Sequence, residues 1–577
     1  MMIKYAILLA ILLAVAAFVS WGFLPARYLP GNRVRSFQLR LHLRLHPGKG
    51  FASILGLWLR WGRLAALRRS GRIRRSLPLW YRAMAPSEHS VYLGRAHWRH
   101  RLRVPLEEHV LVMAPPRTFK TAFLADVILR YPGPVIATTT KADVFALTAA
   151  VRAQRGEVHV FNPQFIGGVP STFSWSPVDG CEDPATAIRR ADAFAFAVAK
   201  DGVEDSTFWS AKASDYLRGY FCAAALAGYD MRAVAAWVSG ADPDVPERIL
   251  AAAGARQWAL TLAELRSEAH KTAATVRMVM SRAISFMADP ALAAAVLPAP
   301  GMGFDIGRFL AERGTVYMVA EAIGEDAPVA PLFAAMATEI HYAAELVGQA
   351  SGSGRLDPPL LMGLDEVTQI CPVPLPVWLS DSGGKGIQII AVAHGEAQLA
   401  GRWGDHGRQV VWDTSSVKVF LPGITDTTTL EAARVLCGQA QWQTRGPDRE
   451  RERAHYDIAT PDMIRQLPAG FALLIRGGNA PVIARLPRAW NNPAYRHARR
   501  RGAVPALRHP LSAEPDMSPG ACFHRGEILD ADGGFGPDAA VNTYGGHPGS
   551  QPEPGAFPDF LPPGWSKGDD GRTFPWN

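Results

Sequence analysis

The chain has 577 residues, of which 48% are apolar and 20% are charged. This composition is typical of a globular protein, and the length is too great for one core, so two or three domains are expected. Five scattered cysteines without a CxxC pair argue against a disulfide framework and a zinc site, and they favour a reducing compartment.

The formal net charge of +9 is unevenly distributed. Between Arg27 and Arg103 there are 18 Lys or Arg residues and a single acid, Glu88. The rest of the chain is therefore near neutral or acidic. A local basic block indicates a partner that carries phosphates, either lipid headgroups or nucleic acid.

The N-terminal segment, residues 1–25, contains an apolar run from Tyr5 to Leu24 that is long enough to cross a bilayer as a helix. The arginines that follow predict a single-pass anchor in the cytoplasmic (inner) membrane, with everything after Pro25 in the cytoplasm. A cleaved signal peptide is the alternative. It is disfavoured because the apolar run is long and the positive charge after it opposes export.

Residues 26–105 form a basic juxtamembrane region. Within it, Phe51 to Arg69 mixes apolar residues with arginines, which predicts an amphipathic helix. The apolar residues are Leu55, Leu59, Trp61, Leu64 and Leu67. This helix is expected either to lie on the inner leaflet or to pack on the body of the protein with a solvated basic face.

Residues 106–164 alternate between strand and helix patterns, which predicts the first part of an α/β nucleotide-binding domain. Residues 165–303 are rich in alanine and helical in periodicity, so they are interpreted as an all-helical insertion. Strand patterns return in residues 304–490, the second part of the nucleotide-binding domain, and end in a hairpin around Gly477-Gly478-Asn479. Residues 491–577 lose periodicity and are predicted to be mostly disordered.

The segment between the first strand and the first helix resembles a phosphate-binding loop, whose usual pattern is G-x-x-x-x-G-K-[ST]. It reads Ala114, Pro115, Pro116, Arg117, Thr118, Phe119, Lys120, Thr121. Lys120 is placed to neutralise the β- and γ-phosphates, and the Thr121 hydroxyl to bind Mg²⁺. Ala114 and Phe119 occupy the two glycine positions, and an ordinary strand-to-helix turn is the alternative interpretation.

A second motif follows the predicted strand Leu360–Leu364. Asp365 and Glu366 stand at its carboxyl end, where parallel sheets gather their ligands. Asp365 is expected to hold Mg²⁺ through water, and Glu366 to polarise the attacking water. The alternative is an Asp-Glu pair that begins the next helix.

Two further candidates flank the predicted strand Ile387–Ala393. His394, after the strand, is a candidate γ-phosphate sensor, with a loop cap as the alternative. Lys385 lies before the strand in Ser382–Gly386, interpreted as a flexible basic loop. It is a candidate to reach the phosphates of a neighbouring subunit, with a plain turn as the alternative.

These segments together resemble type IV coupling proteins of the TraG/TraD kind over roughly residues 107–490. The similarity covers Val112–Asp143, including the loop and Thr138-Thr139-Thr140-Lys141-Ala142-Asp143, and Leu361–Gly438. The second block contains Leu364-Asp365-Glu366-Val367, Gly386-Ile387-Gln388, Gln398-Leu399, Arg402-Trp403-Gly404 and Val417–Ile424 in family order.

The resemblance implies a RecA-like P-loop NTPase with a mostly parallel sheet, an inserted all-alpha domain and an N-terminal transmembrane helix. It implies ATP and Mg²⁺ as cofactors and a ring, usually a homo-hexamer. The expected partners are DNA bound without sequence preference, relaxase or relaxosome proteins, and type IV secretion channel proteins. The all-alpha domain is the family's cargo-recognition part.

The sequence departs from the family at Phe119, at His394 in place of glutamine, at Lys385 near the usual arginine, and in having one evident span. We expect Phe119 to widen or tilt the loop and slow hydrolysis, with Phe119→Gly raising it. The alternative function is a non-hydrolysing scaffold that binds DNA or partners. A motor for protein substrates uses the same core but often carries tandem motor domains, and only one nucleotide site is evident here.

Overall fold

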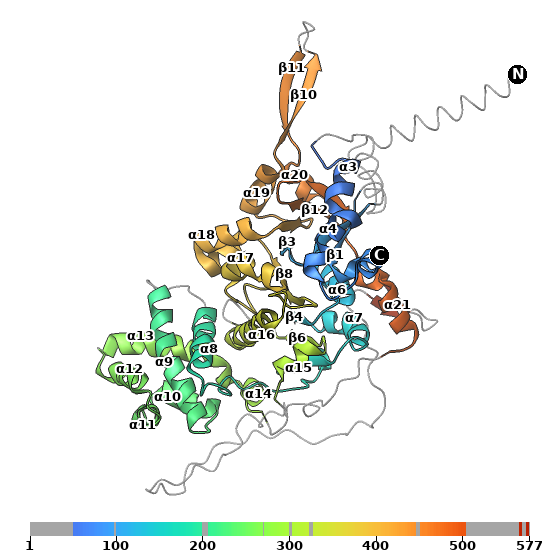
Figure 1. The fold of residues 1–577 in the computed structure, drawn as a ribbon. Helices are drawn as coiled ribbons and strands as arrows, with labels where there is room; N and C mark the ends of the chain where they lie inside the picture. Colours follow the sequence, from blue (N-terminus) through green and yellow to red (C-terminus); the bar gives the residue numbers. More distant parts are fainter. Residues whose placement is uncertain are drawn as a thin grey trace, which may run out of the picture. The chain divides into compact units, whose positions relative to one another are not determined.

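The computed structural model describes residues 50–96, 100–198, 206–268, 270–298, 303–321, 327–445, 451–503, 565–567 and 573–575 (Figure 1). No helix within these ranges is long and apolar enough to span a membrane. The predicted span Tyr5–Leu24 and Cys522 lie outside them. The other four cysteines are free and buried.

The chain divides into two units, Met1–Pro515 and Asp516–Asn577. In the second unit the structure describes one antiparallel pair, β14 (Trp565–Lys567) with β15 (Thr573–Pro575). Everything below concerns the first unit.

The first unit contains an 11-stranded sheet in the order β2-β1-β13-β12-β9-β3-β8-β7-β4-β6-β5. The seven strands from β9 to β5 in this order are parallel, and β12, β13, β1 and β2 continue the sheet antiparallel. The parallel strands are β3 (Val110–Met113), β4 (Val135–Thr139), β5 (Val158–Phe161), β6 (Thr315–Val319), β7 (Leu360–Leu364), β8 (Ile387–Ala393) and β9 (Val417–Phe420).

Most of the parallel strands are buried at every position, which is why they appear in the sequence as short continuous apolar runs. The predicted C-terminal hairpin is confirmed as β12 (Phe471–Arg476) paired with β13 (Val482–Arg485). Two strands were missed in the basic region, β1 (Ser90–Arg95) and β2 (Arg101–Pro105). Strand β2 is hard to recognise in the sequence because its buried residues, Leu102 and Val104, alternate with arginines and form no continuous apolar run.

Helices connect the parallel strands, as a crossover between parallel strands requires. They are α6 (Lys120–Arg130), α7 (Asp143–Arg152), α15 (Ile306–Ala311), α16 (Ala330–Ala350), α17 (Leu375–Lys385) and α18 (Glu396–Thr414). The C-terminal part adds α19 (Thr427–Cys437), the hairpin of β10 (Gln439–Arg445) and β11 (Arg451–Asp457), α20 (Pro461–Arg465), the turn η7 (Ala489–Asn491) and α21 (Pro493–Arg500). Helix α21 begins the segment that was predicted to be mostly disordered.

A helical block lies between β5 and β6 in the chain, coloured green in Figure 1. It consists of α8 (Pro184–Ala197), α9 (Ser206–Leu226), α10 (Met231–Ser239), α11 (Asp244–Ala252), α12 (Arg256–Ser267), α13 (His270–Ala283) and α14 (Pro290–Ala295). Arg189 on α8 donates to Glu339 on α16 at 2.7 Å. This ion pair and a shared apolar core join the block to the sheet domain.

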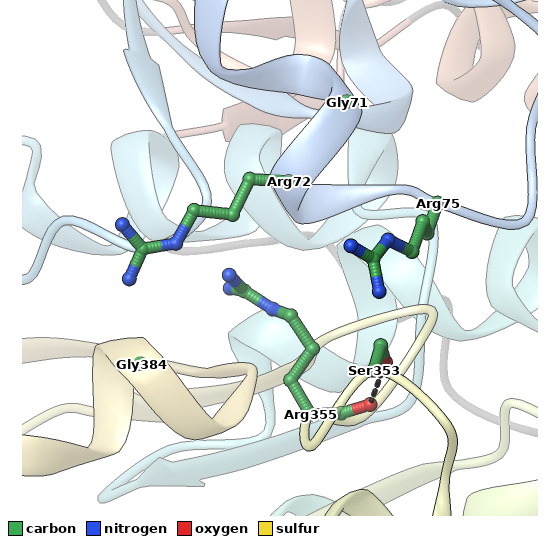
Figure 2. Close-up of a pocket in the computed structure, with 6 residues that line it drawn as sticks. All are labelled: Gly71, Arg72, Arg75, Ser353, Arg355 and Gly384. Atoms are coloured by element: carbon green, nitrogen blue, oxygen red, sulfur yellow. Dashed lines mark hydrogen bonds between the residues drawn. The ribbon is translucent and has the colours of Figure 1, made fainter.

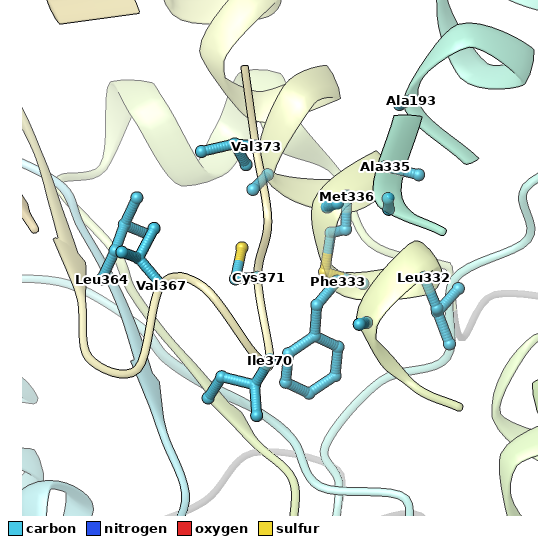
Figure 3. Close-up of a cluster of buried hydrophobic side chains, with 14 of the residues drawn as sticks. Ala193, Leu332, Phe333, Ala335, Met336, Leu364, Val367, Ile370, Cys371 and Val373 are labelled. Carbon is cyan, nitrogen blue, oxygen red and sulfur yellow. The ribbon is translucent and has the colours of Figure 1, made fainter. Parts of the chain in front are cut away.

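That shared core also fixes the turn that follows β7. Figure 3 shows Ala193 of α8 and Phe333 of α16 in one cluster with Val367, Ile370 and Cys371. The last three side chains are fully buried. They anchor the turn immediately after Asp365 and Glu366, so the two carboxylates sit on a rigid support.

The basic region contains α3 (Ile54–Gly56), the π-helical turn η2 (Leu57–Trp61), α4 (Arg63–Ile73) and α5 (Leu79–Met84). The predicted single helix is wrong, because Gly62 adopts an extended conformation and interrupts it. Trp61 is buried against Arg476, but Leu55 is 67% exposed. The segment therefore packs on the body through one side and leaves apolar side chains at the surface.

Candidate functional site

The candidate site lies at the carboxyl ends of three neighbouring parallel strands, β3, β8 and β7. The predicted phosphate loop follows β3, His394 follows β8, and Asp365 and Glu366 follow β7. Adjacent parallel strands place their carboxyl ends at one edge of the sheet, which is where open α/β folds bind ligands. The fold thus brings together residues that are 280 positions apart, with the Nδ1 atom of His394 lying 2.9 Å from the carbonyl oxygen of Ala114.

The loop between β3 and α6 presents a set of free backbone donors. Pro115 and Pro116 have no N–H group, but within the described residues the N–H groups from Arg117 to Ala122 have no acceptor. They surround the N-terminus of α6, where the helix dipole favours an anion. Thr118 steadies the turn, because its hydroxyl donates to the Pro115 carbonyl oxygen at 2.5 Å. The loop can therefore bind phosphate through main-chain donors.

Phe119 adopts the backbone conformation that a glycine would take. Its φ is 68° and its ψ is 15°, in the left-handed region, which costs a residue with a β-carbon about 1–2 kcal/mol. The Arg488 guanidinium lies 4.5 Å from the Phe119 ring centre, and the Trp490 ring lies 6.3 Å from it. Cation–π contacts are worth about 0.5–2 kcal/mol, so they offset much of the strain. The loop keeps the left-handed path at residue 119 in spite of the ring.

Lys120 lies between the two carboxylates of the second motif. Its Nζ is 3.4 Å from Asp365 Oδ1 and forms an ion pair with Glu366 Oε1. Both acids are buried, and the Thr138 hydroxyl supports the turn by donating to the Asp365 carbonyl oxygen at 2.9 Å. The lysine of the first motif and the acids of the second therefore form one charged group.

The two carboxylates differ in pKa. Burial raises the pKa of Asp365, in spite of the charge on Lys120. Burial also acts to raise the pKa of Glu366, but the adjacent His394 imidazole and the charge of Lys120 outweigh it, so the net shift is downward. Glu366 is thus the carboxylate that stays ionised most readily.

His394 joins the loop to Glu366. Its Nδ1 donates to the Ala114 carbonyl oxygen at 2.9 Å, because a carbonyl oxygen can only accept. Its Nε2 lies 3.0 Å from Glu366 Oε2, and this close contact with a carboxylate raises the pKa of His394. The backbone N–H of His394 also donates to Gln398 Oε1 at 3.0 Å. The imidazole is therefore held in one orientation against the acid.

The residues expected to hold Mg²⁺ fit that ion chemically. Asp365 Oδ1 is buried and forms no hydrogen bond with any described residue; its contact is the ion pair with Lys120, so it becomes an available acceptor once Lys120 turns to phosphate. Thr121 is half-buried in the first turn of α6, directly after Lys120. A carboxylate and a hydroxyl oxygen are ligands that Mg²⁺ prefers.

Lys385 is not part of this group. It ends α17, just before β8 begins, and so lies at the opposite, amino-terminal edge of the sheet. Its Nζ pairs with Glu345 at 2.8 Å and with Asp381. The interpretation of Ser382–Gly386 as a flexible loop is wrong, because residues 382–385 form the last turn of the helix and Gly386, with φ 86°, caps it. A contact from Lys385 to another subunit stays a prediction.

Sequence reasoning missed three residues that shape the site: Thr138, Arg488 and Trp490. Arg488 and Trp490 lie about 370 positions after Phe119, just beyond β13, and nothing local marks them as neighbours of the loop. Thr138 belongs to the Thr-Thr-Thr run at the end of β4 that carried part of the family resemblance. That run was the one signal available for it.

Comparison with known proteins identifies the family. The sequence model described as type IV secretory system conjugative DNA transfer matches residues 62–496. The chain belongs to this family. The match includes the loop, the acidic pair and His394, and it extends the resemblance noted above into the basic region.

Solved structures of the conjugative coupling protein TrwB have a similar fold. The unbound form of TrwBdeltaN70 is 17% identical, with 70% of this chain and 90% of that chain covered at a TM-score of 0.52. TrwB in complex with ADP and Mg²⁺ is 19% identical, covers 68% of this chain and 89% of that chain, and has a TM-score of 0.51. A search of curated proteins gave no match. The shared fold is a mixed α/β fold with a large, mostly parallel sheet.

Proposed function

We propose that this protein is a membrane-anchored coupling ATPase that recruits DNA, or a DNA–protein complex, and helps to move it to a type IV secretion pore. The observation that carries the proposal is the position of Lys120 between Glu366 and Asp365, beside a loop of free N–H donors. TrwB has been solved with ADP and Mg²⁺ and with an ATP analogue, which supports a nucleotide as the ligand of this chain.

The residues would share the work as follows. Bound ATP supplies the phosphoanhydride bond that is cleaved, and Mg²⁺ neutralises its charge. The N–H groups around residues 117–122 and Lys120 would hold the phosphates, while the Thr121 hydroxyl, and Asp365 through water, would hold the metal ion. Lys120 exchanges its carboxylate partners for phosphate, which leaves Glu366 free to orient water and accept its proton. His394 keeps Glu366 in place and links it to the loop through Ala114.

The enzymatic part is tested by two substitutions with opposite consequences for binding. Lys120→Ala should abolish nucleotide binding and turnover, because the cation that is placed to neutralise the β- and γ-phosphates is lost. Glu366→Gln should keep binding and lower turnover by about 10²–10⁴-fold, the usual contribution of general base catalysis. Calorimetry with ATP–Mg²⁺ and a phosphate-release assay measure the two effects. If both variants bind and hydrolyse ATP like the wild type, this loop is not the nucleotide site, and a non-hydrolysing scaffold is the better description of the function.

We base the proposal of membrane anchoring on the predicted span and on the exposed side chains of residues 54–84. Large apolar side chains are exposed in residues 54–84, next to the basic residues. They are Ile54, Leu55, Trp58, Leu59, Leu64, Leu79, Trp80, Tyr81 and Met84. Exposed apolar groups among arginines suit the inner surface of a bilayer. This supports the inner-leaflet alternative for the part of the segment that does not pack on the body.

The partners and the assembly are proposed from family membership. The family description is conjugative DNA transfer, so we propose sequence-tolerant DNA binding, relaxosome cargo on α8–α14, a secretion channel partner and a homo-hexameric ring. DNA affinity should fall steeply as salt rises, because phosphate contacts release counterions. Filter binding of two unrelated sequences from 50 to 200 mM salt measures this. Tight binding to one sequence that salt leaves unchanged would contradict it.

A further inference from the structure

A second basic site lies at the amino-terminal edge of the sheet, away from the phosphate loop. A cavity of about 370 Å³ opens between the end of α4, the loop after α16 and the last turn of α17. It is lined by Gly71, Arg72, Arg75, Ser353, Arg355 and Gly384. Figure 2 shows the guanidinium groups of Arg72 and Arg75 on either side of that of Arg355. Three guanidinium groups therefore converge on one cavity.

Arg355 is fixed in place but is not fully hydrogen-bonded. It is only 4% exposed, and its Nη2 donates to the Gly383 carbonyl oxygen at 3.1 Å. Its backbone carbonyl accepts from the hydroxyls of Ser351 and Ser353. Its Nε and Nη1 are buried and have no hydrogen-bond acceptor among the described residues. A buried guanidinium whose N–H donors lack acceptors costs free energy of desolvation. An anion in the cavity would accept these hydrogen bonds and reduce that cost.

The backbone around Arg355 leaves little room for adjustment. Leu356 donates to the Lys385 carbonyl oxygen at 2.9 Å, and Gly386 caps α17 with φ 86°. A β-carbon at residue 386 would stand 2.5 Å from the Leu356 carbonyl oxygen, so only glycine fits this close approach. Arg355 is thus held rigidly with its free donors beside the cavity.

The charge of this group is not balanced within the protein. The nearest carboxylate is Glu107, whose Oε2 lies 3.6 Å from Arg355 Nη1 and 3.7 Å from Arg72 Nε. Both distances are too long for hydrogen bonds, and this Oε2 has no hydrogen-bond partner among the described residues. Asp357 also acts on Arg355, but it is paired with Arg74 and accepts hydrogen bonds from Ser76, so the three guanidinium groups outnumber the carboxylates beside them. The C-terminal dipole of α17 offsets about half a charge more, which still leaves the cavity positive.

We propose that this cavity binds a phosphate group, either of an anionic lipid headgroup or of free phosphate. Guanidinium groups recognise phosphate oxygens through paired N–H donors, and the Nε and Nη1 of Arg355 donate no hydrogen bond to any described residue. Arg72 and Arg75 belong to the same segment that exposes apolar side chains, from Leu64 to Met84. A lipid headgroup is therefore the source that the surrounding surface favours. The proposal is independent of the nucleotide site.

The test uses the full-length chain in detergent with Lys120→Ala as background, so that the nucleotide loop does not contribute. The probes are inorganic phosphate, dihexanoyl-phosphatidylglycerol and dihexanoyl-phosphatidylcholine, titrated by calorimetry. Replacing both Arg72 and Arg75 by alanine should raise the Kd for the anionic probes about tenfold or more, since a charged hydrogen bond is worth at least that factor. Arg355→Gln should do the same.

The controls separate a site from a general effect of charge. Arg68→Ala removes an exposed arginine of α4 that does not line the cavity, and it should leave the Kd within about twofold. Glu107→Gln removes the competing carboxylate and should tighten binding, whereas a purely structural role of these residues predicts no gain. Because Arg72 and Arg75 are exposed, their substitution keeps the test valid even if Arg355→Gln fails to fold.

The outcomes are distinct. Tighter binding of phosphatidylglycerol than of phosphate identifies the lipid source, and equal binding identifies free phosphate. No binding of either, equal losses with Arg68→Ala, or weaker binding with Glu107→Gln would overturn the proposal. The proposal would also be overturned if the arginine variants lost affinity for DNA but bound the phosphate probes unchanged. The arginines would then contact DNA and not a phosphate group in the cavity.

Discussion

Phe119 offers a way to separate backbone strain from steric obstruction in the phosphate loop. Its left-handed conformation costs about 1–2 kcal/mol for any residue with a β-carbon. In the wild type the ring contacts with Arg488 and Trp490 offset this cost. Phe119→Ala keeps the β-carbon and loses the ring, so its strain is uncompensated. Phe119→Gly loses both.

These energies give an expected order of nucleotide affinity. An uncompensated cost of about 1 kcal/mol lowers the population of the binding-competent loop, and hence the apparent affinity, by about fivefold. Phe119→Ala should therefore bind ADP–Mg²⁺ about fivefold more weakly than the wild type, and Phe119→Gly should bind within about twofold of it. Turnover of Phe119→Gly should stay close to that of the wild type, because the loop already follows the path that glycine would take.

Calorimetry of the full-length variants at constant salt measures the affinities, and phosphate release measures turnover. Arg488→Ala is a matched test, since it removes a ring contact without changing the loop sequence and should behave like Phe119→Ala. Equal affinities of the alanine and glycine variants would refute the strain argument. A rise in turnover of about 10²–10³ with Phe119→Gly would show that the ring displaces a transition-state donor, as the sequence alone suggested.

Two further predictions concern protonation and topology. The stabilising effect of the His394–Glu366 pair requires a protonated His394, whose pKa is raised, so it is fully present below the usual histidine pKa of about 6.5 and is lost as pH rises through the raised value. The difference in melting temperature between the wild type and His394→Gln should therefore shrink between pH 6 and pH 9, and a difference that grows over this range would contradict the assignment. Deleting residues 1–25 should release the protein into the soluble fraction in high salt. A reporter fused at Asn577 that is active only outside the cytoplasm would refute the proposed orientation.

The sequence alone determined the parts of the site that rest on local pattern. A strand, a loop with Lys120 and Thr121, and a helix follow one another within about twenty residues, and Asp365 directly follows a strand that is apolar throughout. These signals can be recognised in the sequence because they depend on adjacent residues. A parallel strand that is buried on both faces requires consecutive apolar residues, and a phosphate loop requires particular residues at fixed spacing. The family resemblance rested on the same short segments.

Only the tertiary structure decided which distant residues meet. Strand order places His394 beside Ala114, and the return of the chain after β13 places Arg488 over Phe119. Helix α17 ends at the amino-terminal edge of the sheet, so Lys385 lies there and not at the phosphate loop. Arg355 lines a second cavity at that same edge. These contacts arise from how strands and helices pack, and packing depends on the whole chain. No local pattern in the sequence specifies them, because each partner lies dozens to hundreds of residues away.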